Sequence, residues 1–136
     1  KKQAEEFARQ KAAEFAKFLA ARAKDVNGMK LISVTGADLT PDVDPTFMRN
    51  AAQTLQKELM NTVLVVAFSY EGKPQLLLMY SIVLVAKGRN AGKDIREAAK
   101  FILGGGGGQP SLASAGGKDA SGLEKAMEAL VAIATS

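Results

Sequence analysis

The amino-acid sequence predicts an α/β fold: a long N-terminal helical arm, then a compact mixed sheet with helices, a Gly-rich loop and a C-terminal helix. Three observations support this prediction. The chain has 136 residues, 47% of them apolar, which is enough for one buried core. Two nearly continuous apolar runs, residues 62–70 and 75–86, are rich in β-branched residues and typical of buried strands. Apolar residues at helical spacing precede and follow these runs.

The first residues form the predicted arm, residues 1–27, ahead of a globular domain at 28–136. Phe7, Phe15 and Phe18 share one face of this helix with smaller apolar residues. The helical pattern begins at Lys1 without a cap or an initiating Met, so we expect a truncated piece of a longer helical segment. The phenylalanine face either supports self-association or packs back on the chain's own core. Asn27-Gly28 is expected to end the helix.

The middle of the chain predicts a sheet crossed by one helix. Residues 31–34 read as a short strand, and a helix follows from Pro45, capped by Asp44, to about Met60. The two apolar runs form a hairpin around a turn at residues 71–74. Because both runs lack an alternating polar face, we expect helices or a partner to cover both sides of the sheet.

The second half predicts two further helices separated by five glycines. One helix runs to about Leu103, and the last helix, capped by Ser121, packs back on the sheet. Residues 104–108 therefore lie inside one fold rather than in a linker between domains. Glycine there permits positive φ angles and a close backbone approach, either to another strand or to a bound phosphate chain.

The amino-acid composition limits the kinds of site and partner that the chain can have. The chain contains no cysteine and no histidine, which excludes disulfides, thiolate metal sites, and the commonest general base. The net charge of +4 is uneven, because residues 1–24 carry +4, residues 25–72 carry −3 and residues 73–136 carry +3. An anionic partner such as nucleic acid is one interpretation, and an ordinary solvated surface is the other. The sequence has no apolar run near the roughly 20 residues that span a membrane.

A cluster of basic residues marks the start of the helix after the hairpin. Lys87, Arg89, Lys93 and Arg96 surround backbone N–H groups that a helix N-terminus leaves unpaired, an arrangement that favours anions. The spacing of Gly88 and Gly92 does not match a nucleotide phosphate loop, and the glycine run does not match a dinucleotide fingerprint. A nonspecific site for a phosphate backbone remains, with a merely basic loop as the alternative.

These same residues resemble a known family. The stretches KGRNAGK at 87–93, REAAK at 96–100, GGGGGQP at 104–110 and AGGKD at 115–119 together resemble the C-terminal, DHH-associated domain of bacterial alanyl-tRNA synthetases. DHH-family phosphoesterases, which share a nucleic-acid-binding domain of this kind, are the alternative. Their glycine run typically leads into histidine, whereas here it leads into Gln109-Pro110, so the synthetase resemblance is favoured.

The resemblance implies a noncatalytic domain that binds the body of alanine-specific tRNA and helps to assemble the enzyme in the cytoplasm. It implies no cofactor in this piece, with ATP, magnesium and zinc belonging to the rest of the parent ligase. Its expected partners are tRNA, the remainder of the synthetase chain, and a second copy through Phe7, Phe15 and Phe18, with no membrane. The residues expected to contact nucleic acid are Lys87, Arg89, Asn90, Lys93, Arg96, Lys100, Gly104, Gly105, Gly106, Gly107, Gly108, Gln109 and Lys118.

Overall fold

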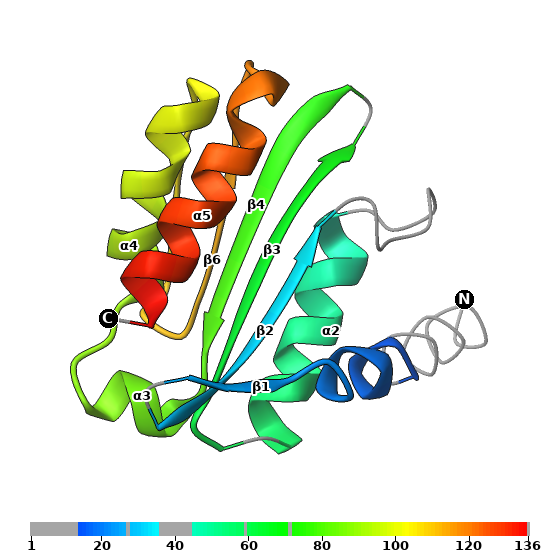
Figure 1. Ribbon diagram of the computed structural model, residues 1–136, viewed down its shortest axis with the longest axis vertical. Helices are drawn as coiled ribbons and strands as arrows, with labels where there is room; N and C mark the ends of the chain where they lie inside the picture. Colours follow the sequence, from blue (N-terminus) through cyan, green and yellow to red (C-terminus); the bar gives the residue numbers. More distant parts are fainter. Residues whose placement is uncertain (1–13, 27, 36–44, 59, 71, 136) are drawn as a thin grey trace.

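The computed structural model describes residues 14–26, 28–35, 45–58, 60–70 and 72–135, and it confirms the α/β class. One six-stranded sheet runs in the order β1-β2-β3-β4-β6-β5 and separates two layers of helices. Helices α4 and α5 lie on one face of the sheet, and α2 and the helical residues 14–20 lie on the other (Figure 1). The predicted cover on both faces is therefore present.

The N-terminal half of the sheet begins with a short antiparallel pair. Strand β1 (Lys24–Val26) pairs with β2 (Met29–Thr35), and Gly28 adopts a φ of 79° between them. The prediction that a helix continues to Val26 is wrong, because β2 offers backbone partners to these residues. Ala16 and Leu19 of the preceding helix are fully buried on the α2 side of the sheet. The described part of that helix thus packs on the chain's own core, while the division into arm and domain stays a prediction.

Helix α2 (Pro45–Glu58) crosses from β2 to β3 (Thr62–Tyr70), and these two strands are parallel. Both elements match the predicted ranges closely, although the expected Asp44 cap lies outside the described residues. Strand β3 continues antiparallel into β4 (Lys73–Tyr80), which confirms the hairpin. Alternate residues of β3 and β4 enter the two cores, and this explains why both strands lack a polar face.

The predicted second strand at 75–86 is wrong in its last part. Strand β4 ends at Tyr80, and α3 (Ile82–Ala86) follows as a short helix after Ser81. The N–H of Ser81 still donates to Thr62, the first residue of β3, and beyond it no strand remains for pairing. The chain turns, and Leu84 and Val85 then donate their N–H groups to the Ser81 carbonyl. Local helical bonds thereby override the strand preference of the sequence IVLVA.

The glycine run is itself a strand. Helix α4 (Ala91–Ala99) continues through the 3-10 turn η2 (Lys100–Ile102) to β5 (Gly105–Gly108), which pairs antiparallel with β6 (Leu112–Gly116). Strand β6 pairs in turn with β4, so β5 forms the edge of the sheet. The 3-10 turn η3 (Ala120–Gly122) leads into α5 (Leu123–Ala134). The predicted Ser121 cap is wrong, because the Asp119 side chain accepts from the Ser121 N–H instead.

Candidate functional site

A first candidate site lies at the N-terminus of α4, and we call it the α4-start hollow. It has a volume of about 400 Å³. Asn90 caps the helix, since its Oδ1 accepts from the Lys93 N–H at 3.1 Å, and the side chains of Lys87 and Lys93 are exposed. Positive side chains therefore gather at the positive end of the helix dipole, where an anion gains from both. The hollow is lined by Lys87, Gly88, Arg89, Asn90, Lys93, Asp94 and Ile133.

Beneath this hollow, the Tyr80 side chain is fully buried and its hydroxyl donates to Asp94 Oδ2 at 2.5 Å. Burial and then this hydrogen bond raise the pKa of Tyr80 above its ordinary value. The Arg89 guanidinium lies 5.9 Å from the centre of the Tyr80 ring and donates to the Ile133 carbonyl at 3.2 Å. Asp94 and Arg89 thus hold α4 against β4 and α5, and Lys87 and Lys93 are the exposed cations of the hollow.

The glycines at 104–108 differ in what surrounds them. A Cβ atom on Gly104 or Gly106 would overlap the backbone of β6, and one on Gly108 would lie 2.6 Å from the Leu112 carbonyl oxygen. A Cβ atom on Gly105 would meet nothing within 4 Å. The close approach to another strand is therefore what Gly104, Gly106 and Gly108 permit, whereas contact of this run with a phosphate chain stays a prediction.

The remaining predicted cations lie along α4 and beyond its end. The Nε–H of Arg96 donates to the Gly106 carbonyl at 3.3 Å, which holds the side chain against the edge strand. Lys100 forms an exposed ion pair with Glu97 at 3.1 Å, and the exposed Lys118 follows β6. The structure therefore gathers Lys87, Arg89, Asn90 and Lys93 at one end of α4 and places Lys100 and Lys118 near its other end.

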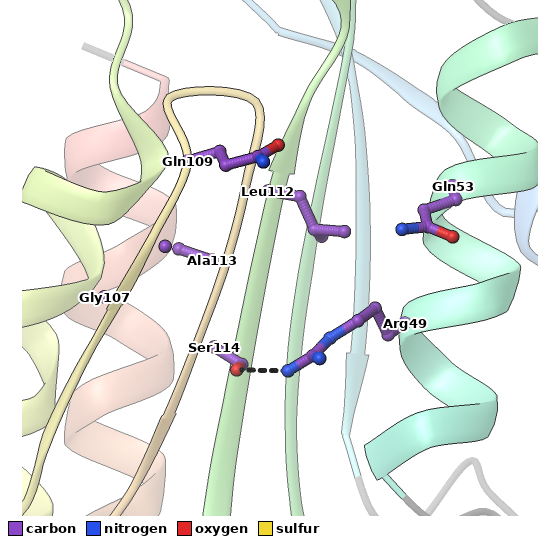
Figure 2. A pocket seen from close by; sticks show the side chains of 8 residues that line it. Arg49, Gln53, Gly107, Gln109, Leu112, Ala113 and Ser114 are labelled. Atoms are coloured by element: carbon purple, nitrogen blue, oxygen red, sulfur yellow. Dashed lines mark hydrogen bonds between the residues drawn. The ribbon is translucent and has the colours of Figure 1, made fainter.

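A second candidate site lies on the opposite face of the sheet, between α2 and the β5–β6 hairpin, and we call it the α2-side hollow. Its volume is about 290 Å³. Figure 2 shows Arg49 and Gln53 extending from α2 toward the strands, with Arg49 Nη2 donating to Ser114 Oγ at 3.2 Å. The lining residues are Arg49, Gln53, Gly107, Gly108, Gln109, Leu112, Ala113 and Ser114.

Sequence reasoning singled out Gly107, Gly108 and Gln109 in this second hollow but missed Arg49, Gln53 and Ser114. A signal was present on α2, where Arg49, Gln53 and Gln56 recur at spacings of four and three and form a polar stripe. The Gln56 side chain donates to the Tyr80 carbonyl at 3.1 Å, so the stripe faces the sheet. The stripe therefore marks the side of α2 that borders the strands, with Arg49 and Gln53 still exposed to solvent.

Comparisons with known proteins identify the family of this chain. The family model described as the DHHA1 domain matches residues 28–136. The chain belongs to the DHHA1 domain family. The crystal structure of the C-Ala domain from Aquifex aeolicus alanyl-tRNA synthetase superposes on this DHHA1 chain with a TM-score of 0.69 at 28% identity. That alignment covers 84% of this chain and 98% of the C-Ala domain.

Curated relatives of this DHHA1 chain are alanine–tRNA ligases. The ligase from Bacteroides thetaiotaomicron is 40% identical over 135 residues, which make up 98% of this chain and 15% of that ligase. The ligase from Cytophaga hutchinsonii is 44% identical over 126 residues, or 91% of this chain and 14% of that ligase. The chain thus spans about one seventh of the length of these relatives, and the resemblance to synthetase C-terminal domains is confirmed.

The predicted self-association residues lie partly in the described structure. Phe7 lies outside the described residues. The Phe15 ring packs on Phe18 and on Phe47 of α2, with ring centres 5.7 and 5.4 Å away, so it belongs to the core. Phe18 remains 44% exposed, with the Arg22 guanidinium 5.7 Å from its ring centre.

No helix in the part of the chain that the structure describes is long and apolar enough to cross a bilayer. No group of three or more acidic side chains in these described ranges is placed to hold a metal ion.

Proposed function

We propose that this domain is the noncatalytic, tRNA-binding and assembly part of an alanyl-tRNA synthetase. The observation that supports it most is the α4-start hollow, where the exposed Lys87 and Lys93 flank a capped helix N-terminus. Such a site attracts phosphates without reading sequence, as expected for a domain that holds the tRNA body. ATP, magnesium and zinc belong, in this proposal, to other parts of a cytoplasmic synthetase chain.

Substitution of Lys87 and Lys93 tests whether the domain binds tRNA through this hollow. In a filter-binding or anisotropy titration of the 136-residue chain with tRNA, the Lys87→Ala/Lys93→Ala variant should bind roughly ten-fold more weakly at low salt and show a shallower salt dependence, because two phosphate contacts disappear. Lys125→Ala is the matched control, since Lys125 is exposed on α5 eight residues before Ile133, or about 12 Å along the helix. Equal affinities of the wild type and the double variant would contradict the proposal.

Assembly is the second part of the proposal. Phe18 is the more exposed of the two described phenylalanines of the helical face, at 44%, so it is the residue through which a second copy would contact this face. Sedimentation velocity across a concentration series would report a dimer that Phe18→Ala weakens. A monomer at every concentration would contradict this part and leave the tRNA proposal unaffected.

A further inference from the structure

We infer that the α2-side hollow binds a single unpaired nucleobase of an RNA whose backbone runs past α4. This inference rests on the proposed function, because it specifies a second contact for the same RNA. It adds Arg49 and Gln53 to the predicted nucleic-acid-binding residues, and it assigns them to a base rather than to phosphate.

Glycine backbone forms part of the floor of the hollow. The pairing of β5 with β6 places Gly107 opposite Ser114, and Gly105 opposite Gly116, so these residues share the face toward α2. A Cβ atom on Gly105 would meet no atom within 4 Å, and the half-buried Leu112 is the large apolar side chain of the floor. The absence of side chains at Gly107 and Gly108 lets the face of a planar ring approach this part of the strand closely.

One guanidinium group lines this hollow, and a second lies at the edge strand beside it. Arg49 projects from α2 and is oriented by its bond to Ser114. Arg96 comes from α4 and reaches the edge strand, where its Nη2 atom lies 3.3 Å from the Cβ position of Gly107. Guanidinium planes stack on bases and donate hydrogen bonds to their acceptor edges, so Arg49 can bind a ring that enters this hollow.

The remaining polar groups also fit a base. Gln53 and Gln109 are exposed at the hollow, and each amide carries both a donor and an acceptor, which suits the edge of a base better than a phosphate. A volume of about 290 Å³ lies at the lower end of small-ligand sites. It suits one nucleotide and excludes a duplex, whose bases remain stacked inside the helix.

The two hollows are compatible with one RNA strand. Residues at the start of α4 line one hollow and residues of α2 line the other. These two helices lie on opposite faces of the sheet (Figure 1). Strand β5 is the edge between these faces, and Arg96 binds to it from the α4 side. An RNA strand whose phosphates contact Lys87 and Lys93 can therefore cross the β5 edge and place one unpaired nucleotide in the α2-side hollow.

The test compares RNAs that differ only in unpaired bases. The 136-residue chain is titrated with a short RNA hairpin that has an unpaired loop, and with a blunt RNA duplex of equal nucleotide number. Arg49→Lys keeps the charge but loses the planar fork, and Gln53→Ala removes one amide; both side chains are exposed, so folding should persist. We expect each to weaken hairpin binding roughly five- to ten-fold and to leave duplex binding unchanged. Lys125→Ala again serves as the matched surface control.

Other outcomes overturn the inference, and they separate it from the proposed function. If Arg49→Lys and Gln53→Ala bind the hairpin like the wild type while Lys87→Ala/Lys93→Ala binds it weakly, the base site is wrong and the RNA-binding proposal stands. If neither RNA binds the wild type, both are wrong. If guanosine and uridine monophosphates bind as tightly as the hairpin, with the same sensitivity to Arg49→Lys, the hollow takes a free nucleotide and the link to RNA is overturned.

Discussion

The β3–β4 hairpin and the β5–β6 hairpin pack in opposite ways. Every residue of β3 from Thr62 to Phe68 is buried, and β4 adds large side chains to both cores. The neighbouring β5–β6 pair has four glycines on one strand and mostly small residues on the other, so backbone lies directly against backbone. The β3–β4 hairpin is stabilised by large buried side chains, and we call it the first hairpin. The β5–β6 hairpin, the second hairpin, is stabilised by the missing side chains of its glycines, which let the two backbones pack closely.

The largest expected effect is a truncation in the first hairpin. Leu78 of β4 is fully buried between Val65 and Ala113, so Leu78→Ala leaves a cavity and should lower the free energy of unfolding by about 3 to 4 kcal/mol. Urea denaturation followed by circular dichroism measures this loss. Leu103→Ala removes the same atoms from a side chain that is 67% exposed, and it should change stability by less than about 0.5 kcal/mol. Similar losses in the two variants would contradict the role given to volume in β4.

An enlargement in the second hairpin should have the next largest effect. Gly106→Ala forces a methyl group onto Ala115 of the paired strand, and we expect a loss of about 2 to 3 kcal/mol because two backbones must separate. Gly105→Ala is the matched control, because the added methyl group meets open space and neither glycine has a positive φ. If both variants unfold at the same urea concentration, the glycines of β5 do not act by close packing.

A smaller effect is expected where the two hairpins meet α4. Tyr80→Phe removes the hydroxyl that donates to Asp94, which should lower the free energy of unfolding by about 1 to 2 kcal/mol at neutral pH. Because the pKa of Tyr80 is raised on folding, its contribution is complete below about pH 10, the ordinary tyrosine value, and falls as pH rises above it. The stability difference between the wild type and Tyr80→Phe should therefore shrink above that pH in chemical denaturation.

Tyr70→Phe, at the far end of β3, controls for the loss of a tyrosine hydroxyl. If the stability difference between the wild type and Tyr80→Phe stays constant to higher pH, ionisation of the Tyr80 hydroxyl does not change the free energy of unfolding.

The smallest expected effect concerns the ion pair between Lys100 and Glu97. Both side chains are exposed, so Lys100→Ala should lower stability by only about 0.3 kcal/mol. A thermal scan at low and at high salt measures this loss, which should disappear at high salt. A loss comparable to that of Tyr80→Phe would show that the end of α4 depends on charge rather than on packing.

Much of the first hairpin could be predicted from sequence, and little of the second. Strand β3 has its predicted bounds because β-branched and other apolar side chains report their surroundings directly. Strand β5 carries no side chains and therefore has no alternating pattern, so the glycine run could be recognised as a close approach but not as a strand. The end of β4 at Tyr80 depends on where its partners β3 and β6 begin, which no local pattern reports.

The two hollows also differ in how much of each could be predicted from the sequence. The α4-start hollow was predicted because Lys87, Arg89, Asn90 and Lys93 are close together in the sequence. The α2-side hollow joins Arg49 to Ser114, 65 residues later, and that contact depends on the sheet order that places β6 beside β4. The polar stripe on α2 was visible in the sequence, but its partner surface was not.

The glycine strand also has a consequence for motion. Strand β5 contributes no side chains to either core and pairs with β6 along one edge alone, so we expect it to open at a lower free energy than β3 and β4, each of which pairs along both edges. Arg49 and Arg96 each bind one strand of this hairpin from a different helix. An RNA bound to both arginines would close the hairpin between the two helices, and amide hydrogen exchange at Gly105–Gly108 would slow when it binds.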